Sequence, residues 1–217
     1  MVKTKICANQ DRDDLMTSAG ANAVGFIVAT PESGRNISLE DAMHLEKEVP
    51  PFTSTVVVTA ETETELLEKI IDKIGPNYLQ LHSSLTPERI EEIAAVTGNR
   101  TGIITLLTVE GKPRYLQKRA RELADSPAKA ILLDSKTGNR AGGTGKVHDW
   151  KLSREIRDTL YPFPVILAGG LNPDNVSKAI KTVKPYGVDV ATGVEKSGEK
   201  SEKKIECFLE EVKNCET

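Results

Sequence analysis

Two reactive side chains stand where strand-like runs of this chain end. Cys7 closes the run at residues 2–7, and Asp134 directly follows Ile131-Leu132-Leu133. A thiol and a carboxyl group on opposite sides of one pocket suggest a general base and a general acid that move protons on a small molecule. The alternatives are an inert buried thiol at Cys7 and a cap or loop-anchoring carboxylate at Asp134. An ionised carboxylate in such a place is costly unless it is paired or functional, which favours a functional Asp134.

Other polar side chains occupy similar positions. Gln80 and His82 close the run at residues 78–82, and Asp189 lies within the run at residues 187–191. His82 either lines the same pocket or forms a hydrogen bond to the next loop. Arg35 lies in a polar loop, where it is either a solvated surface charge or a planar fork that binds a substrate carboxylate.

Glycine-rich turns follow two consecutive strand-like runs. Gly169-Gly170 follows the apolar residues 164–168, and Thr192-Gly193 follows residues 187–191. Two such turns suggest a phosphate site after strands seven and eight of a (β/α)8 barrel, although two ordinary strand-to-helix turns would look alike. A sugar phosphate anchored there, with proton transfer at Cys7 and Asp134, requires no metal and no organic cofactor.

Two further features bear on anion binding. Asn172 as N-cap and Pro173 at the first helical position predict a helix whose free backbone amides would face the phosphate. The sequence Gly142-Gly143-Thr144-Gly145-Lys146 is a candidate lid or second anion contact, but an isolated glycine-rich loop is weak support.

Strand and helix patterns alternate eight times along the chain. This alternation predicts parallel strands with crossover helices, and eight repeats favour a single (β/α)8 TIM barrel over residues 1–217. An open, doubly wound sheet is the competing fold, but the dinucleotide fingerprint G-x-G-x-x-G is absent. The predicted strands cover residues 2–7, 23–28, 53–59, 78–82, 102–107, 128–134, 164–168 and 187–191.

Composition excludes several classes of function. A hydrophobic content of 38%, a charged content of 28% and a net charge of −3 describe a soluble globular protein with no reason to bind nucleic acid or a membrane. We find no signal peptide and no run that could span a membrane. Three widely spaced cysteines fit the reducing cytoplasm, and the histidines lack metal-ligand spacing.

Seven motifs, in order and each near the predicted end of a strand, resemble those of phosphoribosylanthranilate isomerase, an aldose–ketose isomerase of tryptophan biosynthesis. The resemblance covers essentially the whole chain. The motifs are Lys5-Ile6-Cys7, Ala23-Val24-Gly25-Phe26-Ile27, Gln80-Leu81-His82, Leu132-Leu133-Asp134-Ser135, Gly142-Gly143-Thr144-Gly145-Lys146 with Asp149-Trp150, Ala168-Gly169-Gly170-Leu171-Asn172-Pro173-Asp174-Asn175-Val176, and Gly187-Val188-Asp189-Val190 with Thr192-Gly193-Val194-Glu195.

The resemblance implies a cofactor-free Amadori rearrangement of an aminoaldose phosphate to an aminoketose phosphate. By motif, Cys7 matches the general base that removes the C2 proton, and Asp134 matches the acid that opens the ribose ring. Arg35 matches the arginine facing the anthranilate carboxylate. The residues that match the family's phosphate-binding positions are Gly169, Gly170, Thr192 and Gly193. Those that match other pocket positions are His82 and Asp189.

The chain departs from the family pattern in three places. Ala8 and Ser83 replace glycines that the family usually has, and residues 28–31 replace an aromatic-proline stretch. All three changes fall in loops that shape the pocket. They bear on affinity and on the placing of Arg35, and leave the acid and base in place.

Two other functions compete with this interpretation. A different phosphosugar enzyme on the same barrel would need either metal-binding histidines, as an epimerase does, or a lysine at a strand end, as indole-glycerol-phosphate synthase does. Only His82 is suitably placed for the first, and neither Lys5 nor Lys129 for the second. A phosphosugar-binding barrel without catalysis is the other competitor, which the presence of both Cys7 and Asp134 disfavours. Either a monomer or a homodimer is compatible with the sequence.

Overall fold

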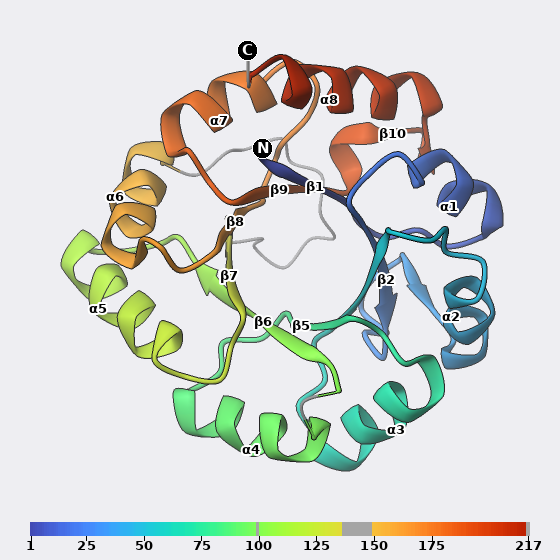
Figure 1. Cartoon of the computed structure of the whole chain (residues 1–217), viewed down its shortest axis with the longest axis horizontal. Coiled ribbons are helices and arrows are strands. Elements are labelled where there is room, and N and C mark those ends of the chain that lie inside the picture. The colour runs from blue at the N-terminus through green and yellow to red at the C-terminus, as the bar shows by residue number, and fades with distance from the viewer. Residues whose placement is uncertain (99, 136–148, 216–217) are drawn as a thin grey trace.

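A closed barrel of parallel strands forms the centre of the molecule, and helices surround it (Figure 1). The computed structural model describes residues 1–98, 100–135 and 149–215. Around the barrel the strands follow the order β1-β9-β8-β7-β6-β5-β4-β2, and pairing of β1 with β2 closes the ring. The predicted (β/α)8 barrel is therefore confirmed. Within the described ranges, no helix combines the length and the apolar composition needed to cross a membrane.

The strands alternate with helices along the chain. The barrel strands are β1 (Lys3–Ile6), β2 (Ala23–Val28), β4 (Ser54–Thr59), β5 (Tyr78–Leu81), β6 (Gly102–Thr108), β7 (Ala130–Asp134), β8 (Val165–Leu167) and β9 (Gly187–Val190). The helices are α1 (Arg12–Ser18), α2 (Leu39–Glu46), α3 (Thr64–Ile74), α4 (Pro87–Thr97), α5 (Pro113–Ala124), α6 (Trp150–Leu160), α7 (Val176–Val183) and α8 (Glu202–Asn214).

Capping residues explain where several helices begin. Asp11 accepts a hydrogen bond from the amide of Asp14 at α1, and Ser38 accepts one from the amide of Asp41 at α2. Thr86 caps α4, with proline in its first turn. Each of these side chains satisfies an amide that the first helical turn leaves unpaired.

The predicted start of α7 is wrong by three residues. The helix begins at Val176, with Asn175 rather than Asn172 at the cap position. The Asn172 side chain instead accepts a hydrogen bond from the amide of Asp174, and Asn175 bonds both the Asn172 amide and the Gly170 carbonyl. These local bonds keep Asn172 and Pro173 in a turn and delay the helix.

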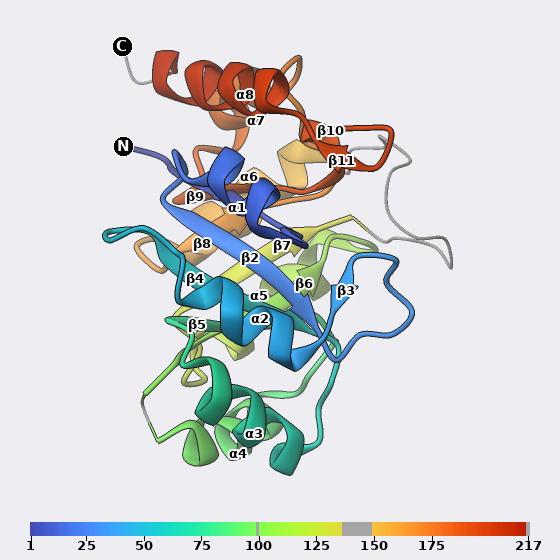
Figure 2. The same cartoon turned by 90° about the vertical axis from the view of Figure 1, so that its right-hand side faces the viewer.

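Three short strands were not predicted. β3 (Asn36–Ile37) pairs with β2, and β10 (Glu195–Lys196) forms a hairpin with β11 (Glu199–Lys200). Two-residue strands are too short to show a periodic pattern. In Figure 2 these strands lie at the opposite end of the barrel from the chain termini. They therefore frame the face where the barrel strands end.

The core has two layers. The larger one lies between the barrel and the helices, and a smaller one inside the barrel includes Cys7, Val56, Val58 and Leu132. Because side chains alternate along a strand, Lys5 shares the inner face with Cys7, whereas the fully buried Ile6 points toward the helices. The barrel interior thus holds ionisable groups beneath its open end.

Candidate active site

The predicted base and acid lie at the same end of the barrel. Cys7 directly follows β1, and its amide donates to the carbonyl of Val190 at the end of β9. Asp134 is the last residue of β7. Only β9 and β8 separate β1 from β7 in the strand order. The fold therefore places the thiol and the carboxyl group at the mouth of one barrel, on strands that are not neighbours.

The Cys7 thiol is buried among charged groups. Burial raises its pKa, and the positive charges of Lys5 and Lys200 act in the opposite direction by stabilising the thiolate. Gly25 of β2 leaves room for the sulfur, because a Cβ atom there would lie 2.9 Å from Cys7 Sγ. The site thus holds a thiol whose ionised form depends on neighbouring cations.

Asp134 keeps its proton to a higher pH than an ordinary aspartate does. Burial raises its pKa to about 6, although the Ser135 amide, which donates to its Oδ1, favours the charged form. The glycine at position 169 is required here: its φ is +81°, and a Cβ atom would lie 2.6 Å from Asp134 Oδ1 and 2.4 Å from Ser135 Oγ. The turn after β8 is therefore packed directly against the predicted acid.

His82 and Asp189 also lie at this end of the barrel. Burial lowers the pKa of His82, so the imidazole is neutral, and its Nδ1 has no hydrogen-bond partner among the residues that the structure describes. Both carboxylate oxygens of Asp189 accept hydrogen bonds from Lys5 Nζ, each at 3.0 Å. The predicted pocket residue Asp189 is thus paired with a lysine that the sequence analysis set aside.

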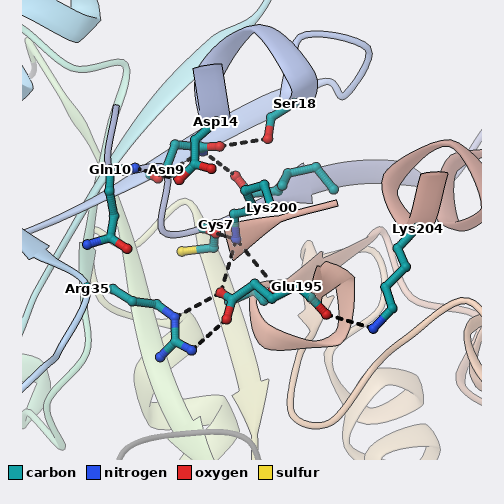
Figure 3. Close-up of polar contacts among 12 residues, drawn as sticks. Cys7, Asn9, Gln10, Asp14, Ser18, Arg35, Glu195, Lys200 and Lys204 are labelled. Atoms are coloured by element: carbon teal, nitrogen blue, oxygen red, sulfur yellow. Dashed lines mark hydrogen bonds and ion pairs between the residues drawn. The ribbon is translucent and has the colours of Figure 1, made fainter. Parts of the chain in front are cut away.

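Arg35 points toward the barrel mouth rather than into solvent. Its Nε and Nη2 atoms donate to the two carboxylate oxygens of Glu195, at 2.8 and 2.6 Å (Figure 3). The hydrogen bonds that Arg35 donates to Glu195 raise the pKa of the guanidinium group most, and the charges of Glu195 and Cys7 raise it further. The arginine therefore lies within electrostatic reach of the thiol.

The two predicted phosphate turns touch each other. Thr192–Val194 form a 3-10 turn directly after β9. A Cβ atom at Gly193 would lie 1.8 Å from the carbonyl oxygen of Leu171, in the turn after β8. Gly169 and Gly170 both have positive φ, which glycine adopts without strain. The fold thus places the turn that contains Gly193 against the turn that follows Gly169-Gly170.

Two of the three departures from the family pattern, Ala8 and Ser83, have simple structural explanations. Ala8 has a φ of +64°, a left-handed conformation that favours glycine, so alanine holds the same backbone at some cost in strain. The backbone of Ser83 does not have the positive φ that would favour glycine, and the Ser83 hydroxyl donates a hydrogen bond to the carbonyl of Ala60. The predicted lid or anion contact, Gly142 to Lys146, lies outside the described residues.

Sequence reasoning missed Lys5, Glu195 and Lys200 as members of the site. The period of two that places Lys5 on the inner face with Cys7 was a usable signal. Glu195 and Lys200 gave no such signal, because they lie on a hairpin of two-residue strands.

Comparisons with known proteins identify the family of the chain. Residues 4–211 match the family model described as N-(5'-phosphoribosyl)anthranilate (PRA) isomerase. The chain is 38% identical over 218 residues to the N-(5'-phosphoribosyl)anthranilate isomerase of Methanothrix thermoacetophila, covering 100% of both chains.

Solved structures give the same result. Phosphoribosyl anthranilate isomerase from Thermotoga maritima superposes with a TM-score of 0.85 at 36% identity, covering 99% of this chain and 100% of that one. Another structure of such an isomerase, in complex with reduced 1-(o-carboxyphenylamino)-1-deoxyribulose 5-phosphate, gives a TM-score of 0.81 at 33% identity, with 99% and 100% covered.

Proposed function

The chain belongs to the N-(5'-phosphoribosyl)anthranilate isomerase family of tryptophan biosynthesis, and we propose that Cys7 and Asp134 catalyse its reaction as general base and general acid. The substrate is N-(5-phosphoribosyl)anthranilate and the product is 1-(2-carboxyphenylamino)-1-deoxyribulose 5-phosphate. We propose that this Amadori rearrangement proceeds without a metal or an organic cofactor. The observation that carries the assignment of roles is that Cys7, directly after β1, and Asp134, the last residue of β7, lie at the same end of one barrel; the raised pKa of Asp134 agrees with it.

The first step opens the ribose ring. Asp134 donates its proton to the ring oxygen while the bond between that oxygen and C1 breaks. The lone pair of the anthranilate nitrogen forms a double bond to C1, giving an iminium ion. Because burial raises the pKa of Asp134 to about 6, a useful fraction of the carboxyl groups is protonated near neutral pH, and the acid is well matched to this transfer.

The second step moves hydrogen between carbons. The Cys7 thiolate removes the proton from C2, and the electron pair of that C–H bond neutralises the iminium ion to give an enolamine. Addition of a proton at C1 and loss of one from the C2 hydroxyl then give the ketone. Substrate and product have the same atoms, so no redox partner is required. Lys5 and Lys200 support the thiolate that this step needs.

Other residues bind the two anionic ends of the substrate. The backbone of Gly169-Gly170 and Thr192-Gly193 binds the phosphate, as the contact between the two turns supports. Arg35 binds the anthranilate carboxylate. His82, whose Nδ1 lacks a partner in the described part of the chain, forms a hydrogen bond to the substrate. Asp189 lines the same pocket and holds Lys5 in place by their ion pair. The complex of a related isomerase with a reduced aminoketose phosphate supports a phosphosugar ligand.

We propose that the protein acts in the cytoplasm, as a monomer or a homodimer. All three of its cysteines are free, which suits a reducing compartment.

An activity assay tests the proposal. Phosphoribosylanthranilate is fluorescent, so its loss on adding the purified protein is followed directly, with and without EDTA. We expect turnover that EDTA does not reduce. A protein that binds a product analogue but turns nothing over would be a binding barrel, and loss of activity in EDTA would contradict the metal-free reaction.

A further inference from the structure

Glu195 connects three parts of the site. It follows directly after the Thr192–Val194 turn, so its backbone is continuous with the proposed phosphate site. Its carboxylate accepts two hydrogen bonds from Arg35, a residue that is 160 positions away in the sequence. Figure 3 shows the arginine and the carboxylate facing each other beside Cys7.

The Glu195 carboxylate is held firmly from the opposite side. Its side chain is only 7% exposed, and Lys200 Nζ, which is 2% exposed, lies 3.4 Å from Oε1. The same ammonium group donates to the carbonyl of Cys7 at 2.7 Å and to that of Ala191 at 3.3 Å. Lys204 Nζ donates to the Glu195 carbonyl at 2.6 Å. The carboxylate therefore has a fixed position relative to the thiol.

Glu195 is ionised in this setting. Burial acts to raise its pKa, but hydrogen bonds from Arg35 and the charge of Lys200 outweigh burial and hold the pKa below its ordinary value. Asp14 of α1 is a further charged group that interacts with Lys200, and burial raises the pKa of that carboxyl group. Glu195 thus remains negatively charged while it accepts the two hydrogen bonds from Arg35.

The pairing with Glu195 uses one edge of the guanidinium group. Nε and Nη2 are occupied, whereas Nη1 has no hydrogen-bond partner among the described residues. The Nη1–Nη2 edge still carries donors in the geometry that matches a carboxylate. The Arg35 side chain is partly exposed, at 21%, so the guanidinium group is not closed off by packing.

We propose that Glu195 is a positioning residue for substrate recognition: it fixes Arg35 so that the free Nη1–Nη2 edge meets the substrate's aromatic carboxylate. The inference rests on the proposed function, in which Arg35 binds that group. A free arginine side chain would lose several rotatable bonds on binding substrate, and prior ordering by Glu195 removes this cost before the ligand arrives. Among the described residues, Glu195 forms no hydrogen bond with the Cys7 thiol or with Asp134, so its main contribution lies in ground-state binding and therefore in KM.

Glu195→Gln tests the inference against ligands with and without the carboxylate. Glutamine keeps the size, but its amide nitrogen cannot accept a hydrogen bond from Arg35. We expect the Kd of reduced 1-(2-carboxyphenylamino)-1-deoxyribulose 5-phosphate to rise roughly tenfold, the loss expected for one charge-assisted bond and its ordering. The Kd of the phenylamino analogue without the carboxyl group should stay within about twofold. Titration calorimetry measures both.

Two controls make the result specific. Glu48→Gln breaks the exposed Arg12–Glu48 pair, which is equally short at 2.6 Å but lies outside the site, and it should change neither Kd. In an Arg35→Ala background, Glu195→Gln should have no further effect on the carboxylate ligand, because the residue it positions is gone.

The outcomes separate this inference from the proposed function. Equal weakening of both ligands, or no change in either, would overturn the positioning role while wild-type turnover of phosphoribosylanthranilate still stood. Absence of wild-type turnover would instead contradict the proposed function. If Glu195→Gln does not fold, Glu195→Asp replaces it in the same comparison: the shorter side chain keeps the charge but cannot reach both nitrogens, and the same selectivity for the carboxylate ligand is expected.

Discussion

Lys5 and Asp189 are register partners on β1 and β9, and Lys5 Nζ lies 3.0 Å from both carboxylate oxygens of Asp189. The two side chains are 5% and 8% exposed, so the ion pair is inside the barrel. Cys7, His82 and Asp134 all interact electrostatically with both members of the pair. A single buried ion pair therefore influences the proposed base, the proposed acid and a proposed binding residue.

Replacing Lys5 should affect both stability and the thiol. Lys5→Met leaves Asp189 buried without its partner, and loss of one member of a buried pair typically costs about 3–5 kcal/mol in the free energy of unfolding. It also removes the charge that most strongly favours the Cys7 thiolate, so the pKa of the thiol should rise further. Urea denaturation measures the first effect, and the pH dependence of Cys7 alkylation measures the second.

A double variant checks that interpretation. Lys5→Met with Asp189→Leu removes both charges and should recover much of the lost stability, because no unpaired charge remains. The alkylation profile should stay shifted to higher pH. A wild-type alkylation profile in both the single and the double variant would mean that Lys5 does not stabilise the thiolate.

Gly193→Ala should impair binding of the phosphate group. Its Cβ atom would lie 1.8 Å from the Leu171 carbonyl oxygen, so the two turns must move apart. We expect KM for the phosphosugar to rise at least tenfold with a smaller change in kcat, the pattern of lost ground-state binding. Gly34→Ala is the matched control, since a Cβ atom there meets nothing within 4 Å. Comparable kinetics for the two variants would mean that the contact between the two turns is not needed for phosphate binding.

Asp134→Asn should stabilise the fold at neutral pH while it abolishes catalysis. The folded pKa of about 6 lies above the unfolded value near 3.9, so the native state binds more protons between these values. Stability contributed by Asp134 is therefore fully present below about pH 4 and is lost as pH rises through 6. A neutral asparagine avoids this loss.

Urea titrations at two pH values measure that effect. At pH 8 we expect the variant to gain up to roughly 2–3 kcal/mol over the wild type, with a much smaller gain at pH 4. An equal gain at both pH values would point to packing rather than to the ionisation of Asp134.

The same variant also tests the acid role. A substrate whose ribose ring is already open does not need protonation of the ring oxygen. Asp134→Asn should therefore recover much of the lost rate on such a substrate, because only the first step requires the acid. Equal slowing on closed and open substrates would assign Asp134 another role.

The parts of the structure that follow local patterns could be predicted from the sequence. Eight apolar runs alternating with helical segments predicted the barrel, and the ends of those runs located Cys7 and Asp134 at one face. The predicted start of α7 was wrong because hydrogen bonds of the Asn172 and Asn175 side chains compete with helix formation. These bonds are visible only in the three-dimensional structure.

The charged contacts of the site could not be predicted in this way. Lys5 and Asp189 are 184 positions apart, and their pairing depends on the register of β1 against β9. The contact of Arg35 with Glu195 spans 160 positions and depends on a short hairpin. In neither pair does the sequence around one residue indicate which residue it contacts.

The primary kinetic isotope effect of C2-deuterated substrate tests most directly whether Cys7 removes the C2 proton and Asp134 opens the ribose ring. General-base assistance is worth roughly 10²–10⁴-fold, so in Cys7→Ser removal of the C2 proton should become rate-limiting and kcat/KM should show a large isotope effect. In Asp134→Asn ring opening should limit the rate, and the isotope effect should fall close to unity. A large effect in Asp134→Asn, or none in Cys7→Ser, would contradict the assignment of the base and the acid.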